Sequence, residues 1–100
     1  MVKTIKWSKR AKTEFFRIAT YLEENFSKQT ADNFADVIAK KVEWLAKFPN
    51  VGRKAPIRKT VRFILVGRNR RIYYRIVGQT IVISHIFDTR QHPDKDIHQK

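Results

Sequence analysis

The sequence predicts an α+β fold, in which a helical hairpin packs on an antiparallel sheet in the order β-α-α-β-β-β. Apolar residues recur at helical spacing along two consecutive segments in the first half of the chain. Pro49 and Gly52 then interrupt the helical pattern. A block from Thr60 to Arg90 follows, in which apolar strand formers alternate with arginines.

The N-terminal half is expected to form one strand and two helices. Residues 2–7 alternate apolar and polar side chains, which is typical of an edge strand. Ser8 and Ser27 are expected to cap the helices, because a serine hydroxyl accepts from N–H groups of the first turn. The first helix, over 9–26, has an apolar face made by Ala11, Phe15, Ile18 and Leu22. The second, over 29–47, has a face made by Ala31, Phe34, Ala35, Ile38, Val42 and Leu45.

The C-terminal half is expected to form three strands over 61–66, 70–77 and 80–87, after a basic loop over 53–59. Gly78 comes first in the two-residue link between the last two strands, which suits a type II′ turn. That turn sets Val77 opposite Thr80, and therefore Tyr74 opposite Ile83 and Ile76 opposite Ile81. The same register puts His85 beside Ile72 on the helix-covered face. The other face is expected to collect Arg71, Tyr73, Arg75, Val82, Ser84 and Ile86.

Length and composition indicate a single globular domain, expected over 1–93 and followed by a polar tail over 94–100. The formal net charge is +13, from 22 Lys and Arg against 9 Asp and Glu. Such a charge favours polyanionic partners, either nucleic acid or an acidic protein. A membrane surface is not expected as a partner, because no segment joins a clean apolar face to a basic one. No signal peptide or long apolar run is present in the sequence, so a cytoplasmic protein is the default expectation.

The sharpest candidate site is the cluster of Arg71, Tyr73 and Arg75 on one strand face. In a functional interpretation, the guanidinium groups hold phosphate oxygens and the tyrosine stacks on a base. The alternative is a solvated strand face, although these strands carry no compensating acids. Further cations could contact the same target, or could simply be solvated or paired at the surface: Arg62, Arg90, Lys54, Lys59, Arg68 and Arg70.

The remaining residues with chemical potential receive structural interpretations. His85 is expected to be partly buried and hydrogen-bonded, and Glu14 to pair with a nearby Lys or Arg on the helix surface. Trp7 and Trp44 are expected at the edges of the core, with interface anchoring as the alternative. Three scattered histidines without acidic partners at ligand spacing make a poor metal site, and the absence of cysteine excludes a thiolate site. The absence of a Gly-rich phosphate loop argues against nucleotide-dependent chemistry, so no cofactor is expected.

Three segments together resemble the RelE/ParE superfamily of bacterial type II toxins, over about residues 2–93. The opening KWSKRAKTEFFRIATYLEENF is similar to the family's first strand and helix, and KVEWLAKFPNVGR is similar to the end of its second helix. The segment VRFILVGRNRRIYYRIVGQTIVISHIFDTRQHP is similar to its sheet, in which an Arg precedes an aromatic-Tyr-Arg run. Another Arg follows the last strand in that pattern.

The resemblance implies one of two activities. RelE-like members cut mRNA on the ribosome with basic and aromatic residues of the sheet, whereas ParE-like members poison DNA gyrase and need no such set. The FPNVGR turn and the VGRNRRIYYRI strand are more similar to the ParE-like side, and Asp88 stands where many members have a histidine. The resemblance therefore implies a ParE-like gyrase poison. The alternative is a RelE-like endoribonuclease whose catalytic residues would be Arg71, Tyr73, Arg75 and Arg90.

Either activity implies a cognate acidic antitoxin that wraps the toxin in a hetero-oligomer, with DNA gyrase or the mRNA-loaded ribosome as the target. The expected antitoxin contacts are the basic sheet face, the groove of the helical hairpin and the edge of the first strand. The charge alone also fits a third possibility, a plain nucleic-acid-binding module without toxicity.

Overall fold

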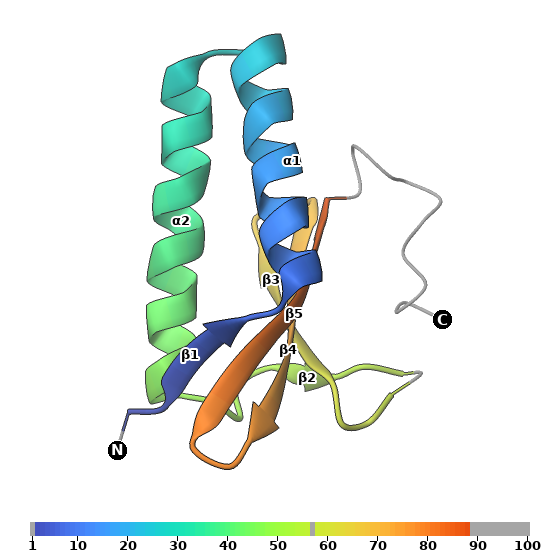
Figure 1. The fold of residues 1–100 in the computed structure, drawn as a ribbon. Helices are drawn as coiled ribbons and strands as arrows, with labels where there is room; N and C mark the ends of the chain where they lie inside the picture. The colour runs from blue at the N-terminus through green and yellow to red at the C-terminus, as the bar shows by residue number, and fades with distance from the viewer. Residues whose placement is uncertain (1, 57, 89–100) are drawn as a thin grey trace.

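The computed structural model describes residues 2–56 and 58–88 of the chain (Figure 1). The two helices stand as an antiparallel hairpin against one face of a sheet (Figure 1). This arrangement confirms the predicted α+β class and the helical hairpin. The elements in chain order are β1 (Thr4–Trp7), α1 (Lys9–Asn25), α2 (Lys28–Lys47), β2 (Arg53–Lys54), β3 (Arg62–Val66), β4 (Arg70–Val77) and β5 (Thr80–Asp88).

The sheet has five strands in the order β1-β5-β4-β3-β2. The pairs from β2 to β5 are antiparallel, but β1 lies parallel to β5, with Thr4 opposite Thr80 and Trp7 opposite Ile83. The prediction of an antiparallel sheet is therefore wrong for β1, and the sheet is mixed. Alternation of apolar and polar residues assigns side chains to faces but carries no information about the direction of a neighbouring strand.

The strand β2 corrects a second prediction. Its two residues lie in the segment predicted as a basic loop, and they pair with Arg62 and Phe63 at the edge of the sheet. Two residues are too few for an alternating pattern, which needs about four to be recognised.

Both predicted helix caps are confirmed. The hydroxyls of Ser8 and Ser27 accept from the N–H groups of Ala11 and Thr30, each at 3.0 Å. Each helix then buries one face against the sheet. The main core is made by Ala11, Ile18, Leu22, Ala31, Phe34, Ile38, Val42, Leu45, Ile64, Val66, Ile72, Tyr74, Ile81, Ile83 and Ile86.

The register between β4 and β5 changes halfway along the pair. Tyr74 lies opposite Ile83 as predicted, but Tyr73 lies opposite His85, so that β5 holds one extra residue at this point. Such a bulge reverses which side chains point to each face beyond it. Ile86 therefore joins the main core opposite Ile72, and His85 shares a face with Tyr73. The predicted faces of His85 and Ile86 are wrong, because the prediction extends the alternation through the bulge.

The turn that follows α2 is held by a buried tyrosine. The Tyr74 hydroxyl donates to the Pro49 carbonyl at 2.7 Å and accepts from the Gly52 N–H at 2.9 Å. Arg62 Nη1 donates to the Gly52 carbonyl at 2.8 Å. A Cβ at Gly52 would lie 2.5 Å from the tyrosine oxygen and 2.9 Å from a backbone carbonyl, so a side chain has no room here. The turn thereby fixes where the chain enters β2 at the sheet edge.

Candidate functional site

The predicted site lies on the sheet face turned away from the helices, which we call the outer face. Direct pairing across the strands arranges its side chains in rows. One row runs through Lys6, Val82 and Arg75. The next runs through Arg53, Phe63, Tyr73 and His85. A third runs through Leu65, Arg71 and Phe87.

Tyr73 is fully buried within this face. Its ring stacks on His85, with the ring centroids 5.2 Å apart and 27° between the planes, and lies 5.5 Å from the Phe63 ring. Ala55 and Val61, which flank the link between β2 and β3, pack in the same cluster. The exposed fraction of Tyr73 is 0%, so a base cannot reach its ring in this arrangement. The predicted stacking on a base therefore conflicts with the position of Tyr73.

The two arginines that flank Tyr73 have different environments. Arg71 is half-buried, with its guanidinium 5.2 Å from the centre of the Phe63 ring and Nη1 3.4 Å from the Tyr73 hydroxyl. Arg75 is exposed beside Val82, and the exposed Lys6 lies on the other side of Val82. Neighbouring strands lie about 4.8 Å apart, so the backbones of Arg75 and Lys6 are separated by about 10 Å. Arg75 and Lys6 thus present two cations to solvent from the same row.

Two of the other predicted binding residues are turned toward the interior. Arg62 contacts the turn after α2, where its Nη1 also lies 3.3 Å from the Asn50 carbonyl. Arg70 is on the helix side of β4, and its Nε lies 3.0 Å from the buried carboxylate of Asp88. Its guanidinium is also 4.9 Å from the centre of the Phe34 ring. This ion pair, of a half-buried arginine with a buried acid, lies where β4 packs against α2.

The remaining predicted cations are scattered. Lys54 is exposed in β2, Lys59 is exposed between β2 and β3, and Arg68 is exposed in the β3–β4 turn. Arg90 lies outside the described residues, as does the predicted tail over 94–100. Among the described residues, the structure therefore does not bring the predicted cations into one cluster, and Arg75 is the exposed member of the original three.

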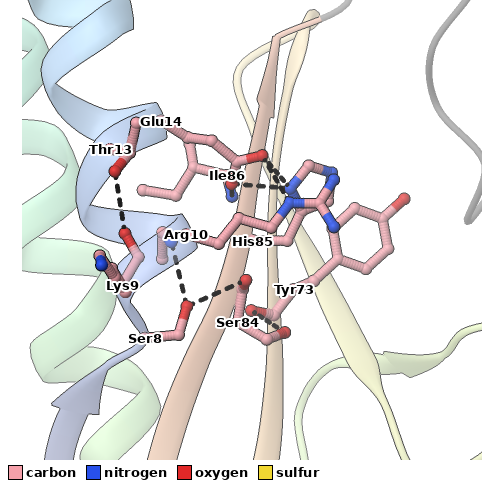
Figure 2. Close-up of polar contacts among 10 residues, drawn as sticks. Ser8, Lys9, Arg10, Thr13, Glu14, Tyr73, Ser84, His85 and Ile86 are labelled. Carbon is pink, nitrogen blue, oxygen red and sulfur yellow. Dashed lines mark hydrogen bonds and ion pairs between the residues drawn. The ribbon is translucent and has the colours of Figure 1, made fainter.

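A pair formed by the half-buried acid Glu14 and the buried His85 joins α1 to β5 (Figure 2). The Glu14 carboxylate accepts from the Ile86 N–H at 2.9 Å and lies 2.6 Å from His85 Nδ1. Its partner from α1 is Arg10, with Nε at 3.0 Å. The strand β1 ends opposite Ile83, so the edge of β5 has no strand neighbour beyond that point. Glu14 takes the place of such a neighbour by accepting a backbone hydrogen bond from this edge.

Ser8 also forms hydrogen bonds with this edge of β5, at residues that precede Ile86. Its N–H donates to the Ile83 carbonyl at 2.9 Å, and its hydroxyl donates to the Ser84 carbonyl at 3.2 Å. Ser84 in turn donates from its own hydroxyl to the Tyr73 carbonyl at 3.1 Å, inside the bulge (Figure 2). Where β1 has ended, side chains at the start of α1 therefore form the hydrogen bonds that a neighbouring strand would make to the edge of β5.

The electrostatics of this pair favour an ionised Glu14. Burial raises the pKa of the Glu14 carboxyl, but the hydrogen bonds from His85 and Ile86, the charge of His85 and the Arg10 contact outweigh it. The net result is a pKa below the ordinary value of 4.5. The predicted pairing of Glu14 with a helix cation is confirmed by Arg10, and His85 is buried and hydrogen-bonded as predicted.

The contacts of Glu14 with β5 are the feature that sequence reasoning missed. A signal for them exists, because Glu14 lies between Ala11 and Ile18 on the face of α1 that is buried. An acid in that position needs a partner inside the protein. The partner itself, His85, is 71 residues away, so no local spacing in the sequence reveals it.

Residues 5–93 match the family described as the ParE toxin of the type II toxin–antitoxin system parDE. The chain belongs to the ParE toxin family. The predicted RelE/ParE superfamily is thereby confirmed. No curated protein matches the sequence.

Two solved structures are similar to this ParE-family chain. One is from the chromosomal ParDE toxin–antitoxin system of P. aeruginosa, at 21% identity and a TM-score of 0.75, covering 87% of this chain and 96% of that one. The other is a mutant of the E. coli toxin RelE in the free state, at 13% identity and a TM-score of 0.58, covering 93% and 90%. At these identities the likeness establishes the shared fold of the ParE and RelE proteins.

The outer face of this ParE-family chain is characterised by exposed cations that are spread over the face. In the part of the chain that the structure describes, no three His, Asp or Glu side chains are placed to hold a metal ion. None of the helices over residues 2–56 and 58–88 is long and apolar enough to cross a membrane. The charged groups exposed on and around the outer face can bind an anionic surface through Lys6, Arg53, Lys54 and Arg75.

Proposed function

We propose that this ParE-family chain is a toxin that arrests growth by poisoning DNA gyrase in the cytoplasm. The observation that most supports this function is the internal use of the groups that a nuclease would need. Tyr73 is buried, His85 is buried against Glu14, and Arg71 lies over the Phe63 ring. A toxin that acts by binding another protein needs no general acid or base, so these contacts are compatible with its activity.

An RNA nuclease makes stronger demands on the outer face. A general base has to approach the 2′-hydroxyl to within about 2.6–3.2 Å, and cations have to surround the phosphate. His85 is only 5% exposed, and its Nδ1 is engaged by Glu14. These two facts weigh against a histidine base.

The second candidate function is a RelE-like, ribosome-dependent mRNA endoribonuclease. The observation that favours it is the pair of exposed cations, Arg75 and Lys6, in one row of the outer face. Together with Arg71, they would hold a phosphate on the face where RelE-like members bind mRNA.

The proposal includes a cognate acidic antitoxin that forms a hetero-oligomer with this chain. The net charge of +13 supports an acidic partner, because opposite charge accelerates and orients association. A partner that binds only the folded toxin also stabilises it, by about 4 kcal/mol when present at a thousand times its Kd.

The test is brief induction of the chain in bacteria without an antitoxin, followed by mapping of RNA 5′ ends and measurement of the DNA-damage response. We expect growth arrest with a DNA-damage response and intact mRNA, in the parent and in Arg75→Ala alike. New cuts inside translated codons that disappear in Arg75→Ala, but persist in the hairpin control Lys28→Ala, would establish the endoribonuclease instead. Absence of growth arrest would overturn both toxin functions.

A further inference from the structure

The solvent side of α1 carries its charges in two separate groups. The first half of the helix, residues 9–17, has exposed cations at Lys9, Arg10, Lys12 and Arg17. The second half, residues 18–25, has the exposed acids Glu23 and Glu24 and no cation. This order opposes the helix dipole, which favours acids in the first turn of a helix and cations in the last. The stability of α1 therefore does not explain where its charges lie.

The cations of residues 9–17 are available to a ligand. Among the described residues, Lys9, Lys12 and Arg17 form no ion pair. Arg10 pairs with Glu14, but its side chain is still 58% exposed. Glu14 adds little negative charge to this surface, because its side chain is 12% exposed and its oxygens face His85 and the N–H of Ile86.

A shallow hollow lies between these cations. It has a volume of about 470 Å³ and is lined by Lys9, Arg10, Thr13, Glu14 and Arg17. Thr13 is the short residue midway between Lys9 and Arg17 on one helix face, since each is four positions from the next. From Lys9 to Arg17 the helix rises about 12 Å, at about 1.5 Å per residue. One strand of a DNA duplex passes a phosphate about every 3.4 Å, so three or four phosphates fit within about 12 Å.

An exposed aromatic ring borders the same surface. Phe16 is 65% exposed, and it lines a second hollow together with Thr13 and Arg17. Cations for phosphate beside an apolar ring for sugar carbons suit a nucleic-acid backbone, which presents both groups together. The outer face suits this ligand less well, because Lys6 and Arg75 are about 10 Å apart there with Val82 between them.

We propose that residues 9–17 of α1 bind the phosphate backbone of duplex DNA. Contacts to phosphate and sugar carry no sequence information, so the binding is independent of DNA sequence. The acids Glu23 and Glu24 repel phosphate and limit the contact to the first half of the helix. The use of this contact on the DNA that gyrase cleaves rests on the proposed function, whereas the binding of DNA by α1 does not.

The test measures binding of the purified chain to a fluorescent DNA duplex of random sequence over a series of salt concentrations. The triple variant Lys9→Gln, Lys12→Gln and Arg17→Gln should bind at least about tenfold more weakly at low salt. Its plot of log K against log salt should be less steep by about 2.7, at about 0.9 for each lost phosphate contact. The matched control removes the same charge from α2 by Lys28→Gln, Lys40→Gln and Lys47→Gln, all exposed, and should keep the slope of the parent.

Two further variants separate a binding role from a structural one. Phe16→Ala should weaken DNA binding by a similar factor at every salt concentration, because the lost contact is uncharged. Phe48→Ala, which alters an exposed phenylalanine at the end of α2, should leave binding unchanged. The triple variant of α1 should melt at the same temperature as the parent or higher, because the removed cations oppose the helix dipole. A lower melting temperature would mean that these cations stabilise the fold.

Several results would overturn the assignment of α1. Equal losses of affinity in the α1 and α2 triple variants would mean that net charge alone attracts the DNA. A loss as large in the double variant Arg53→Gln and Lys54→Gln would assign binding to the edge of the sheet. Competition by polyglutamate as strong as that by unlabelled duplex, at equal charge, would assign the surface to an acidic protein. Tighter binding of single-stranded RNA of the same length would assign it to RNA.

Purified gyrase separates this inference from the proposed function. A chain that poisons gyrase but fails the DNA test loses only the DNA contact of α1. A chain that binds DNA through α1 but leaves gyrase active loses only the proposed function.

Discussion

Tyr73 and Tyr74 are neighbours in β4, both are 0% exposed, and they are buried on opposite faces of one sheet. Tyr74 lies in the main core under the helical hairpin, with its hydroxyl between Pro49 and Gly52. Tyr73 lies in a smaller cluster on the outer face, between Phe63 and His85. The two helices cover Tyr74, whereas Tyr73 is covered by the short link between β2 and β3 and by neighbouring rings on the outer face.

The difference between the two faces explains why the sequence predicts three neighbouring ligand-binding groups, Arg71, Tyr73 and Arg75, whereas the structure exposes them unequally. A strand that alternates arginines with tyrosines is expected to offer both to a ligand. On the outer face, the small cluster withdraws Tyr73 and part of Arg71, and leaves Arg75 in solvent. Burial of a polar aromatic residue is therefore possible on either face, provided that its ring has partners and its hydroxyl a neighbour.

The largest expected contrast comes from removing one apolar side chain on each face. Ile83→Ala, in the main core, should lower the free energy of unfolding by about 2–5 kcal/mol. Val61→Ala, in the outer cluster, should cost about 1.6 kcal/mol for the two carbon groups removed. Urea unfolding measures both. The exposed Leu65→Ala is the control and should change stability by less than about 0.5 kcal/mol. Equal losses at Ile83 and Val61 would mean that the two faces contribute equally.

A smaller effect is expected from the hydroxyl of Tyr74. Tyr74→Phe leaves the Gly52 N–H and the Pro49 carbonyl without this partner, which should cost about 1–3 kcal/mol. Burial raises the pKa of Tyr74 above 10.0, against the opposing effects of the Gly52 N–H and the Arg62 charge. A raised pKa stabilises the folded protein below pH 10.0, and this stabilisation is lost as the pH rises further.

Thermal unfolding at neutral pH compares Tyr74→Phe with Tyr21→Phe, an exposed tyrosine of α1 that should behave like the parent. If the two variants have the same melting temperature, the Tyr74 hydroxyl does not hold the turn.

The effect expected to be smallest at neutral pH, and visible mainly in acid, is that of Glu14. Its pKa is lowered in the folded protein, so its contribution to stability is present above the unfolded value and is lost as the pH falls through the folded one. The parent should therefore lose stability more steeply below pH 4.5, the ordinary pKa of this carboxyl, than Glu14→Gln does. Unfolding by denaturant at a series of pH values measures this. Parallel pH curves for the parent and Glu14→Gln would contradict the role of the pair, and Glu24→Gln serves as the exposed control.

Much of the fold follows from the sequence, because its signals are local. The caps at Ser8 and Ser27, the apolar faces of the helices and the register from Val77 to Tyr74 each depend on residues close to one another in the chain. The parallel direction of β1 and the pairing of Glu14 with His85 do not, because they join residues about seventy positions apart. No local pattern reports such contacts.

The candidate site was harder to predict for a related reason. The bulge at Ser84 moves His85 from one face to the other. At the bulge, the Ser84 carbonyl accepts from the Ser8 hydroxyl and the Ser84 hydroxyl donates to the Tyr73 carbonyl, so its partners lie on different elements. The burial of Tyr73 depends on Ala55 and Val61, which flank a segment that reads only as a basic loop. Residue type therefore identified the cations of the outer face but not which of them solvent reaches.

The proposed function is that this ParE-family chain acts by binding gyrase and not by cutting RNA. The most direct measurement adds the purified chain to purified DNA gyrase and relaxed plasmid, and follows supercoiling and DNA cleavage. We expect loss of supercoiling with accumulation of cleaved plasmid, unchanged in Arg75→Ala. Normal gyrase activity, combined with cleavage of mRNA on translating ribosomes by the same preparation, would contradict it.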